Sequence, residues 1–125
     1  MSQRALIIIA WIGLFILGFG LRFHHLEERP LHADEATGAR ILAQQLDGEI
    51  YQFNPQHFHG PLLSVSTLPI AAARNERSWA QLSTTTLRYQ AALAGLLLIA
   101  IPLLWRRALG DWGALTAAAL LSTSP

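Results

Sequence analysis

The sequence predicts an all-α integral membrane protein with two transmembrane helices, an incomplete third helix and a long loop containing amphipathic juxtamembrane helices. Three observations predict this class. Apolar residues make up 52% of the 125 residues and charged residues only 14%, where soluble proteins carry roughly 25% charged residues. The apolar residues gather in long uncharged runs. The segment 22–88 between the first two runs is far longer than a connector needs.

Charge and cysteine content exclude several classes of protein. All the basic residues are arginines, and they nearly balance the carboxylates, so the formal net charge is +1. This balance argues against a nucleic-acid-binding protein and against an acidic disordered tail. The chain has no cysteine, which excludes a disulfide scaffold, a thiolate metal site and a cysteine nucleophile. No Gly-rich phosphate loop and no Ser-His-Asp signature can be placed either.

The first membrane span is expected at residues 5–21, an uncharged run between Arg4 and Arg22. Its length of about 26 Å is slightly below the roughly 30 Å of a bilayer core, and the flanking arginines can snorkel to the interface. The alternative is a cleaved signal peptide, which requires small residues at its cleavage site. Gly20 is instead followed by Leu21 and Arg22, so a retained helix is predicted.

A second span is expected at residues 89–105, with Pro102 near its end, where a membrane helix tolerates a kink. The alternative, a buried helix of a soluble core, lacks other segments that could form that core. A third apolar run covers residues 112–125. Because a span needs about 20 residues, the sequence predicts only the start of a third helix, with the remaining helices of the full-length chain as its partners.

The arginines also predict the orientation in the membrane. Arg4, Arg106 and Arg107 flank the spans on the side expected to be cytoplasmic under the positive-inside rule. The loop 22–88 holds six arginines against seven carboxylates, and a loop of this length crosses largely regardless of its charge. We therefore expect a plasma-membrane protein with a cytoplasmic N-terminus and an extracytoplasmic loop, in contact with membrane lipid.

The loop is predicted to begin with an amphipathic helix at about 34–47. Asp34 stands where an N-cap is expected and Glu35 falls in the first turn, where the helix dipole favours an anion. Gly48 is a suitable C-terminal stop. The expected apolar face follows helical spacing and consists of Ala36, Ala39, Ala43 and Leu46.

A second loop helix is predicted at about 61–73, with Pro61 at its first position and Pro69 interrupting it. It is apolar but too short to span, so we expect it to be interfacial or packed on other helices. The polar stretch 74–86 is expected to be a connection.

Two features of the loop could carry chemistry. Asp34 and Glu35 are adjacent carboxylates shortly after the first span, although a capped helix start would explain them equally. His32, His57 and His59, together with Asp34, could form a site for a divalent metal ion. Their spacing matches no standard zinc pattern, so the cofactor is left open.

Two motifs resemble a known family. The stretch RPLHADEA at residues 29–36 and the stretch HGPLL at residues 59–63 follow a short arginine-flanked first helix. This order resembles the N-terminal part of the GT-C class of membrane glycosyltransferases, which includes protein O-mannosyltransferase-like enzymes. The nearest resemblance is to the flippase-associated N-glycosylation branch. Ala33 and Asn54 depart from that branch, which often has histidine and aspartate there, and both departures weaken a metal site.

The resemblance implies a transferase that moves a sugar from a polyprenyl-phosphate donor to an acceptor hydroxyl on the extracytoplasmic side. Asp34 matches the acidic residue of the first loop that acts as general base or helps to hold a metal, with Glu35 as its neighbour. Arg29 and Arg40 are candidates, by proximity only, for binding the leaving phosphate. His59 matches the second motif and could line the same pocket.

Two other classes of function remain open at this point. The chain could be a non-enzymatic member of the family that takes part in flipping of lipid-linked sugars. It could also be a small membrane subunit that only binds partners. Because GT-C enzymes have some ten or more membrane helices, the 125 residues alone are expected to be inactive.

Overall fold

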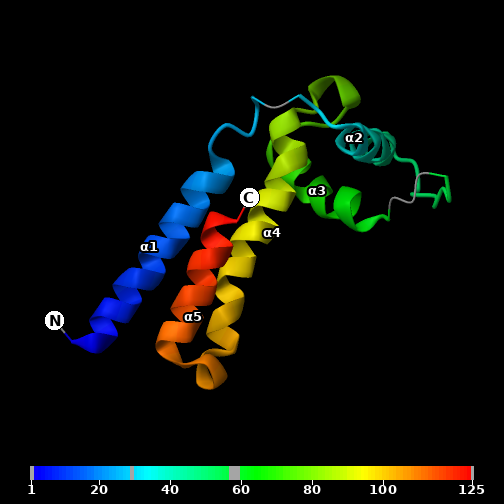
Figure 1. Cartoon of the computed structure of the whole chain (residues 1–125). Helices are drawn as coiled ribbons and strands as arrows, with labels where there is room; N and C mark the ends of the chain where they lie inside the picture. Colours follow the sequence, from blue (N-terminus) through cyan, green and yellow to red (C-terminus); the bar gives the residue numbers. More distant parts are fainter. Residues whose placement is uncertain (1, 29, 57–59, 125) are drawn as a thin grey trace. The chain divides into compact units, whose positions relative to one another are not determined.

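A computed structural model describes residues 2–28, 30–56 and 60–124 (Figure 1). These ranges contain helices and no strand, which confirms the predicted all-α class. The helices are α1 (Gln3–Phe23), α2 (Ala33–Leu46), α3 (Leu62–Ala73), a short 3₁₀ helix η1 (Trp79–Gln81), α4 (Thr84–Leu104) and α5 (Arg106–Thr123).

The chain divides into two compact units. Unit 1 comprises Met1–His24 and Ala92–Pro125, and unit 2 comprises His25–Ala91. Helix α4 begins in unit 2 and ends in unit 1, so its first two turns and its remaining turns serve different packing arrangements.

Unit 1 is built on the packing of α1 along α5, which lie side by side in Figure 1. Its core is apolar, and small alanines on α5 let the helices approach closely. The buried members of this core are Ile7, Trp11, Ile99, Ala114, Leu115 and Ala118. A break at Gly110, with φ +70°, separates the first turn of α5 from the longer helical stretch after it. The predicted start of a third helix at 112–125 thus lies within the longer part of α5.

Two residues of α1, Gly18 and Arg22, make specific contacts with the other helices of unit 1. A Cβ on Gly18 would lie 2.2 Å from Cδ1 of Ile99, so this fully buried side chain would have to shift to admit any larger residue. Arg22 donates to the carbonyl oxygens of Leu121 at 2.5 Å and Ser122 at 3.0 Å, near the C-terminal end of α5. These carbonyls have no partner within the helix, and a cation is favoured at this negative end of the helix dipole.

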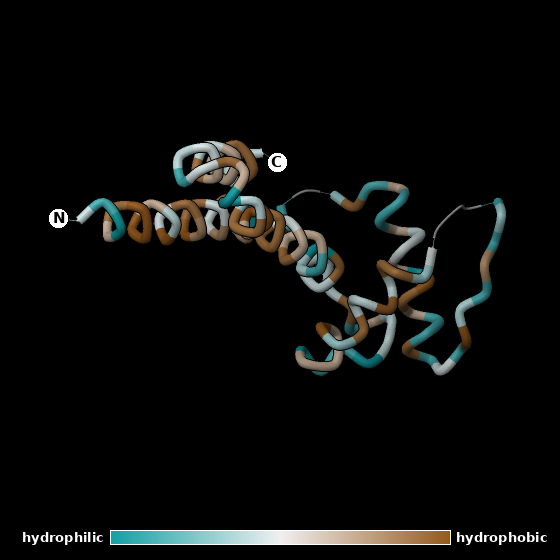
Figure 2. The backbone as a smooth tube through the Cα atoms, turned by 90° about the horizontal axis from the view of Figure 1, so that it is seen from below, coloured by the Kyte–Doolittle hydropathy of each residue, from teal (hydrophilic) through white to brown (hydrophobic). Residues whose placement is uncertain are grey.

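Two of the described helices, α1 and α4, are long and apolar enough to cross a membrane. Only 17% of each apolar window is buried, whereas a core helix of a soluble protein would be mostly buried. Figure 2 shows the hydrophobic colour dominating along α1, with hydrophilic residues at its N-terminal end. Both helices agree with the predicted spans 5–21 and 89–105, but α4 begins five residues earlier than expected.

Unit 2 is built on the packing of α2 against α3. The predicted helix 34–47 is α2, and the predicted helix 61–73 is α3, which begins one residue later because Pro61 is its N-cap. Pro69 lies inside α3 without ending it, so the predicted interruption was wrong.

The predicted apolar face of α2 was partly wrong. Ala39 and Ala43 are buried, but Ala36 is exposed, and Gly38 and Leu42 belong to the buried face instead. The face is rotated because α3 packs here: a Cβ on Gly38 would lie 3.4 Å from a methyl group of Leu63. Gly38 scores low on hydropathy and so was left out of the predicted apolar face, although it is buried.

The ends of the helices in unit 2 explain two further boundaries. Gly48, with φ +88°, ends α2 as predicted: its N–H donates to Gln45 and that of Glu49 to Gln44, which is the Schellman arrangement. The predicted connection 74–86 was partly wrong, because it contains η1 and the first turn of α4. Ser83 accepts a hydrogen bond from the Thr86 N–H at 3.2 Å and so caps the N-terminus of α4.

Candidate functional site

The candidate site lies at the N-terminus of α2, where a capping box holds the backbone. The Nδ1 atom of His32 accepts a hydrogen bond from the Asp34 N–H at 3.4 Å, and the Glu35 carboxylate accepts one from the His32 N–H at 3.0 Å. The N-cap is therefore His32, and the prediction that Asp34 caps the helix was wrong. An imidazole nitrogen can accept a hydrogen bond as a serine oxygen does, and Glu35 three residues later completes the box.

Glu35 is fixed by Arg88 of α4. The guanidinium group donates through Nε to Oε1 at 2.9 Å and through Nη2 to Oε2 at 2.8 Å, which is a bidentate ion pair. The Arg88 side chain is only 12% exposed. The hydrogen bond from Arg88 lowers the pKa of Glu35 to about 2, although burial opposes the shift. Glu35 is thus ionised and paired over the whole physiological pH range.

Arg88 also holds the chain segment that leads into α2. Its Nη1 donates to the carbonyl oxygen of Leu26 at 2.6 Å, and its Nη2 to that of Pro30 at 3.1 Å. The Arg88 side chain therefore connects the first turns of α4 to two points, Leu26 and Pro30, in the stretch of chain that precedes His32. Arg88 was not predicted as a site residue, because it stands at the edge of an apolar run and was taken only as the boundary of the span.

Asp34 has a different environment from its neighbour. Its side chain is 78% exposed, and its Oδ2 atom lies 3.8 Å from Nδ1 of His32. The His32 side chain is 77% exposed. Asp34 therefore presents a carboxylate to the solvent on a backbone that Glu35 and Arg88 keep in place.

The cavity beside Glu35 is too small to hold a sugar. A cavity lined by Glu35, Leu42, Leu63 and Leu87, among others, has a volume of about 30 Å³. This is about the volume of one water molecule in the liquid. Of the two adjacent carboxylates, Asp34 is the more accessible, with 78% of its side chain exposed against 35% for Glu35.

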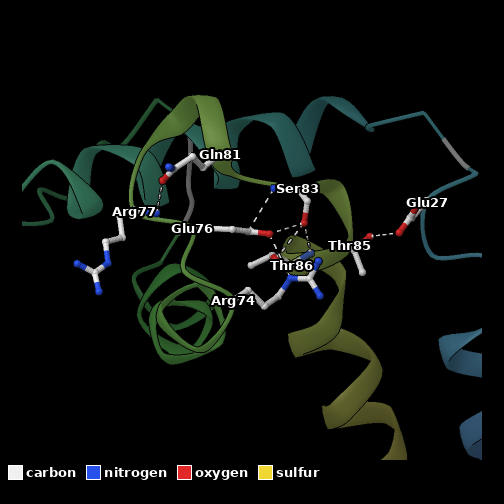
Figure 3. A network of polar contacts seen from close by, with 8 residues as sticks. All are labelled: Glu27, Arg74, Glu76, Arg77, Gln81, Ser83, Thr85 and Thr86. Carbon is white, nitrogen blue, oxygen red and sulfur yellow. Dashed lines mark hydrogen bonds and ion pairs between the residues drawn. The ribbon is translucent and has the colours of Figure 1, made fainter.

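A second carboxylate network, drawn in Figure 3, supports the start of α4. Glu76 is buried and accepts hydrogen bonds from Nε of Arg74 at 3.1 Å and from Oγ of Ser83 at 2.9 Å. Burial alone would raise the pKa of Glu76, but hydrogen bonds from Thr86, Ser83 and Arg74 outweigh it and lower the pKa. The carboxylate therefore stays charged at the positive end of α4.

Glu27 is a third carboxylate that contacts the start of α4, after Glu35 and Glu76. It accepts a hydrogen bond from Oγ1 of Thr85 at 2.9 Å (Figure 3). Neither Glu27 nor Glu76 was predicted to have a role. The signal in the sequence is the hydroxyl-rich run from Ser83 to Thr86, a composition typical of a capped helix start.

Arg40 is the one remaining predicted site residue that lies within the described residues, and it does not join this arrangement. Arg40 is exposed and lines a groove of about 1000 Å³ between α2 and residues 49–55, a groove that neither Asp34 nor Glu35 lines. The predicted residues Arg29, His57 and His59 lie outside the described residues. Among the residues that are described, no group of three or more histidine, aspartate or glutamate side chains could hold a metal ion. The metal site therefore stays a prediction.

Comparison with known proteins gives no match: no family model, no curated protein and no solved structure is similar to this chain. Any function must therefore be argued from the residues and their geometry.

Proposed function

We propose that this chain is the N-terminal part of a membrane glycosyltransferase of the GT-C class, with Asp34 as its general base. The observation that carries the proposal is that two adjacent carboxylates have different surroundings. Glu35 is paired with Arg88, whereas the neighbouring Asp34 is 78% exposed on the same rigid helix start. The resemblance of residues 29–36 to the family motif gives this arrangement its chemical meaning.

In the proposed reaction, an acceptor hydroxyl attacks the anomeric carbon of a sugar carried on a polyprenyl phosphate. Asp34 takes the hydroxyl proton as the new C–O bond forms. The bond between the anomeric carbon and the phosphate oxygen breaks, and the phosphate leaves with the electron pair. Glu35 and Arg88 act as positioning residues, because they touch neither reactant and hold the backbone that carries Asp34.

Membrane attachment is part of the proposal. It is supported by α1 and α4, which are apolar, mostly exposed and long enough to cross a bilayer. We place unit 2 on the extracytoplasmic side, because Arg4, Arg106 and Arg107 all lie at chain positions expected to be cytoplasmic. A polyprenyl-linked donor is held in the same membrane, so the donor and the enzyme meet there.

The test is the variant Asp34→Asn in the protein expressed from its own gene in its own membranes. Transfer of labelled hexose from synthetic polyprenyl phosphates to endogenous acceptors should fall about 100- to 10,000-fold, the usual loss on removing a general base. Asp47→Asn is the matched control, since Asp47 is an exposed carboxylate at the other end of α2 and should leave transfer unchanged.

Intact transfer by Asp34→Asn would remove the base role. Absence of transfer in the unaltered protein, with every polyprenyl donor tried, would instead favour a non-enzymatic role in handling lipid-linked sugars.

A further inference from the structure

Helix α3 is amphipathic in the opposite sense to a helix of a soluble protein. The face that packs inside unit 2 consists of the small residues Ser64, Thr67 and Ala71, which are 4%, 2% and 0% exposed. The opposite face is apolar and open: Leu62 is 78% exposed and Val65 49% exposed. In water, the larger apolar side chains would be expected on the buried face.

The hydroxyl groups of α3 are all bonded to its own backbone. Oγ of Ser64 donates to Pro61 at 3.1 Å, and Oγ1 of Thr67 donates to Leu63 at 2.7 Å. Ser66, on the outward side, donates to the carbonyl oxygen of Leu62 at 2.6 Å. The helix contains no charged residue. Its outward surface therefore presents methyl and methylene groups, with the single hydroxyl there already satisfied.

The chain connections of unit 2 indicate what covers this face. α1 ends at Phe23, two residues before unit 2 begins at His25, and α4 begins inside unit 2. Helices α1 and α4 are the two described helices that could cross a membrane. Unit 2 is thus tethered at both ends by membrane-spanning candidates and cannot move far from a bilayer surface. The 12 residues of α3 extend only about 18 Å, too short to cross the bilayer themselves.

We propose that α3 binds the lipid surface, with the face of Leu62, Val65 and Pro69 in the acyl boundary of the bilayer. Its inner face of small residues stays packed on α2, so the helix joins unit 2 to the lipid. Because α3 carries no arginine or lysine, the binding depends on apolar contact and needs no anionic lipid. The proposal rests on insertion of α1 and α4 in the membrane and is independent of sugar transfer.

The chain has no cysteine, so a single introduced cysteine can carry a fluorescent label without other changes. The experiment uses the whole chain in phosphatidylcholine nanodiscs, in which both membrane faces are open to solvent. Val65→Cys is labelled with an environment-sensitive fluorophore and exposed to doxyl groups on the lipid or to aqueous iodide. Gln44→Cys, exposed on α2, is the control in water, and Leu97→Cys, 70% exposed on α4, is the control in lipid.

We expect the Val65 label to emit at shorter wavelength than the Gln44 label and to be quenched by doxyl lipid rather than by iodide. Leu62→Cys should behave in the same way and serves as a second probe if Val65→Cys does not fold. Replacing part of the lipid with phosphatidylglycerol should leave both signals unchanged.

Two results would overturn the proposal. Quenching of the Val65 and Leu62 labels by iodide, to the extent seen at Gln44, would mean that the face is in water. A blue-shifted label that neither quencher reaches would mean that protein covers the face, either a second copy or further helices. Neither result bears on Asp34, so failure here and failure of the transferase proposal can be distinguished.

Discussion

The two units of this chain differ in the contacts that stabilise each of them internally. Unit 1 is held by apolar packing of α1, α5 and the later turns of α4, with Gly18 leaving room for Ile99. Unit 2 combines the packing of α2 on α3 with a set of carboxylate contacts. The carboxylates of Glu27, Glu35 and Glu76 all reach side chains in or next to the first two turns of α4.

The contrast agrees with the surroundings that we propose for each unit. Apolar surfaces such as those of α1 suit a lipid environment, where packing of small residues rather than charge drives association of helices. Unit 2 has to hold a short helix start in a fixed position with few large apolar side chains available. Bidentate and multiply hydrogen-bonded carboxylates do this with directional contacts. The exposed Asp34 lies in unit 2, close to these carboxylate contacts. The position of its carboxylate should therefore be more sensitive to loss of one charged side chain in unit 2 than to loss of one methyl group there.

The largest effect is expected from breaking the central contact of unit 2 with Arg88→Met. This variant keeps most of the side-chain volume but leaves Glu35 without its partner and the carbonyls of Leu26 and Pro30 without a donor. Because the variant removes four hydrogen bonds, each worth on the order of 1 kcal/mol, it should cost about 3 kcal/mol of unfolding free energy. Unfolding of the full chain in detergent measures this cost, and a change below about 0.5 kcal/mol would contradict the role of Arg88.

A somewhat smaller effect is expected in unit 1 from Gly18→Val. The new side chain would overlap Ile99, and overpacking of this kind costs about 1–3 kcal/mol. Gly13→Val is the matched control on the same helix, because a Cβ at Gly13 meets no other atom within 4 Å. Equal stability of the two variants in the same unfolding assay would show that α1 does not pack closely at Gly18.

The smallest effect should appear in the pH dependence of stability. The pKa of Glu35 falls from an ordinary 4.5 to about 2 on folding, so the unfolded chain binds its proton first. The stabilisation by the Glu35–Arg88 pair is therefore complete above about pH 4.5 and is lost as the pH falls through 2. Melting temperatures of the full chain across this range should decline more steeply than those of Glu35→Gln, and parallel curves would contradict the pairing.

Much of the fold could be predicted because long uncharged runs have few alternatives to helices. The start of α4 was missed for a reason specific to Ser83 and Arg88. Hydropathy counts both side chains as polar, although Ser83 is the N-cap of α4 and Arg88 lies in its second turn. The hydroxyl-rich run 83–86 is a local signal of a capped helix start, whereas the pairing of Arg88 with Glu35, distant in sequence, depends on tertiary structure.

The helix start that carries the candidate site was predicted at about the right position, but its internal arrangement was not predicted. Asp34 was taken as the cap because aspartate is a common N-cap, and histidine is not. The pattern of His32 followed three residues later by Glu35 is a capping box with an unusual first member. The division between Asp34 and Glu35 could not be predicted, because it depends on which carboxylate faces Arg88.

The most direct test of that division is the melting temperature of Asp34→Asn and Glu35→Gln, measured side by side on the full chain. We expect Asp34→Asn to melt with the unaltered protein, since its carboxylate is 78% exposed, and Glu35→Gln to melt several degrees lower, because Arg88 loses its counter-charge. Equal melting of the two variants, or a larger loss in Asp34→Asn, would contradict the assignment of Asp34 to chemistry and Glu35 to structure.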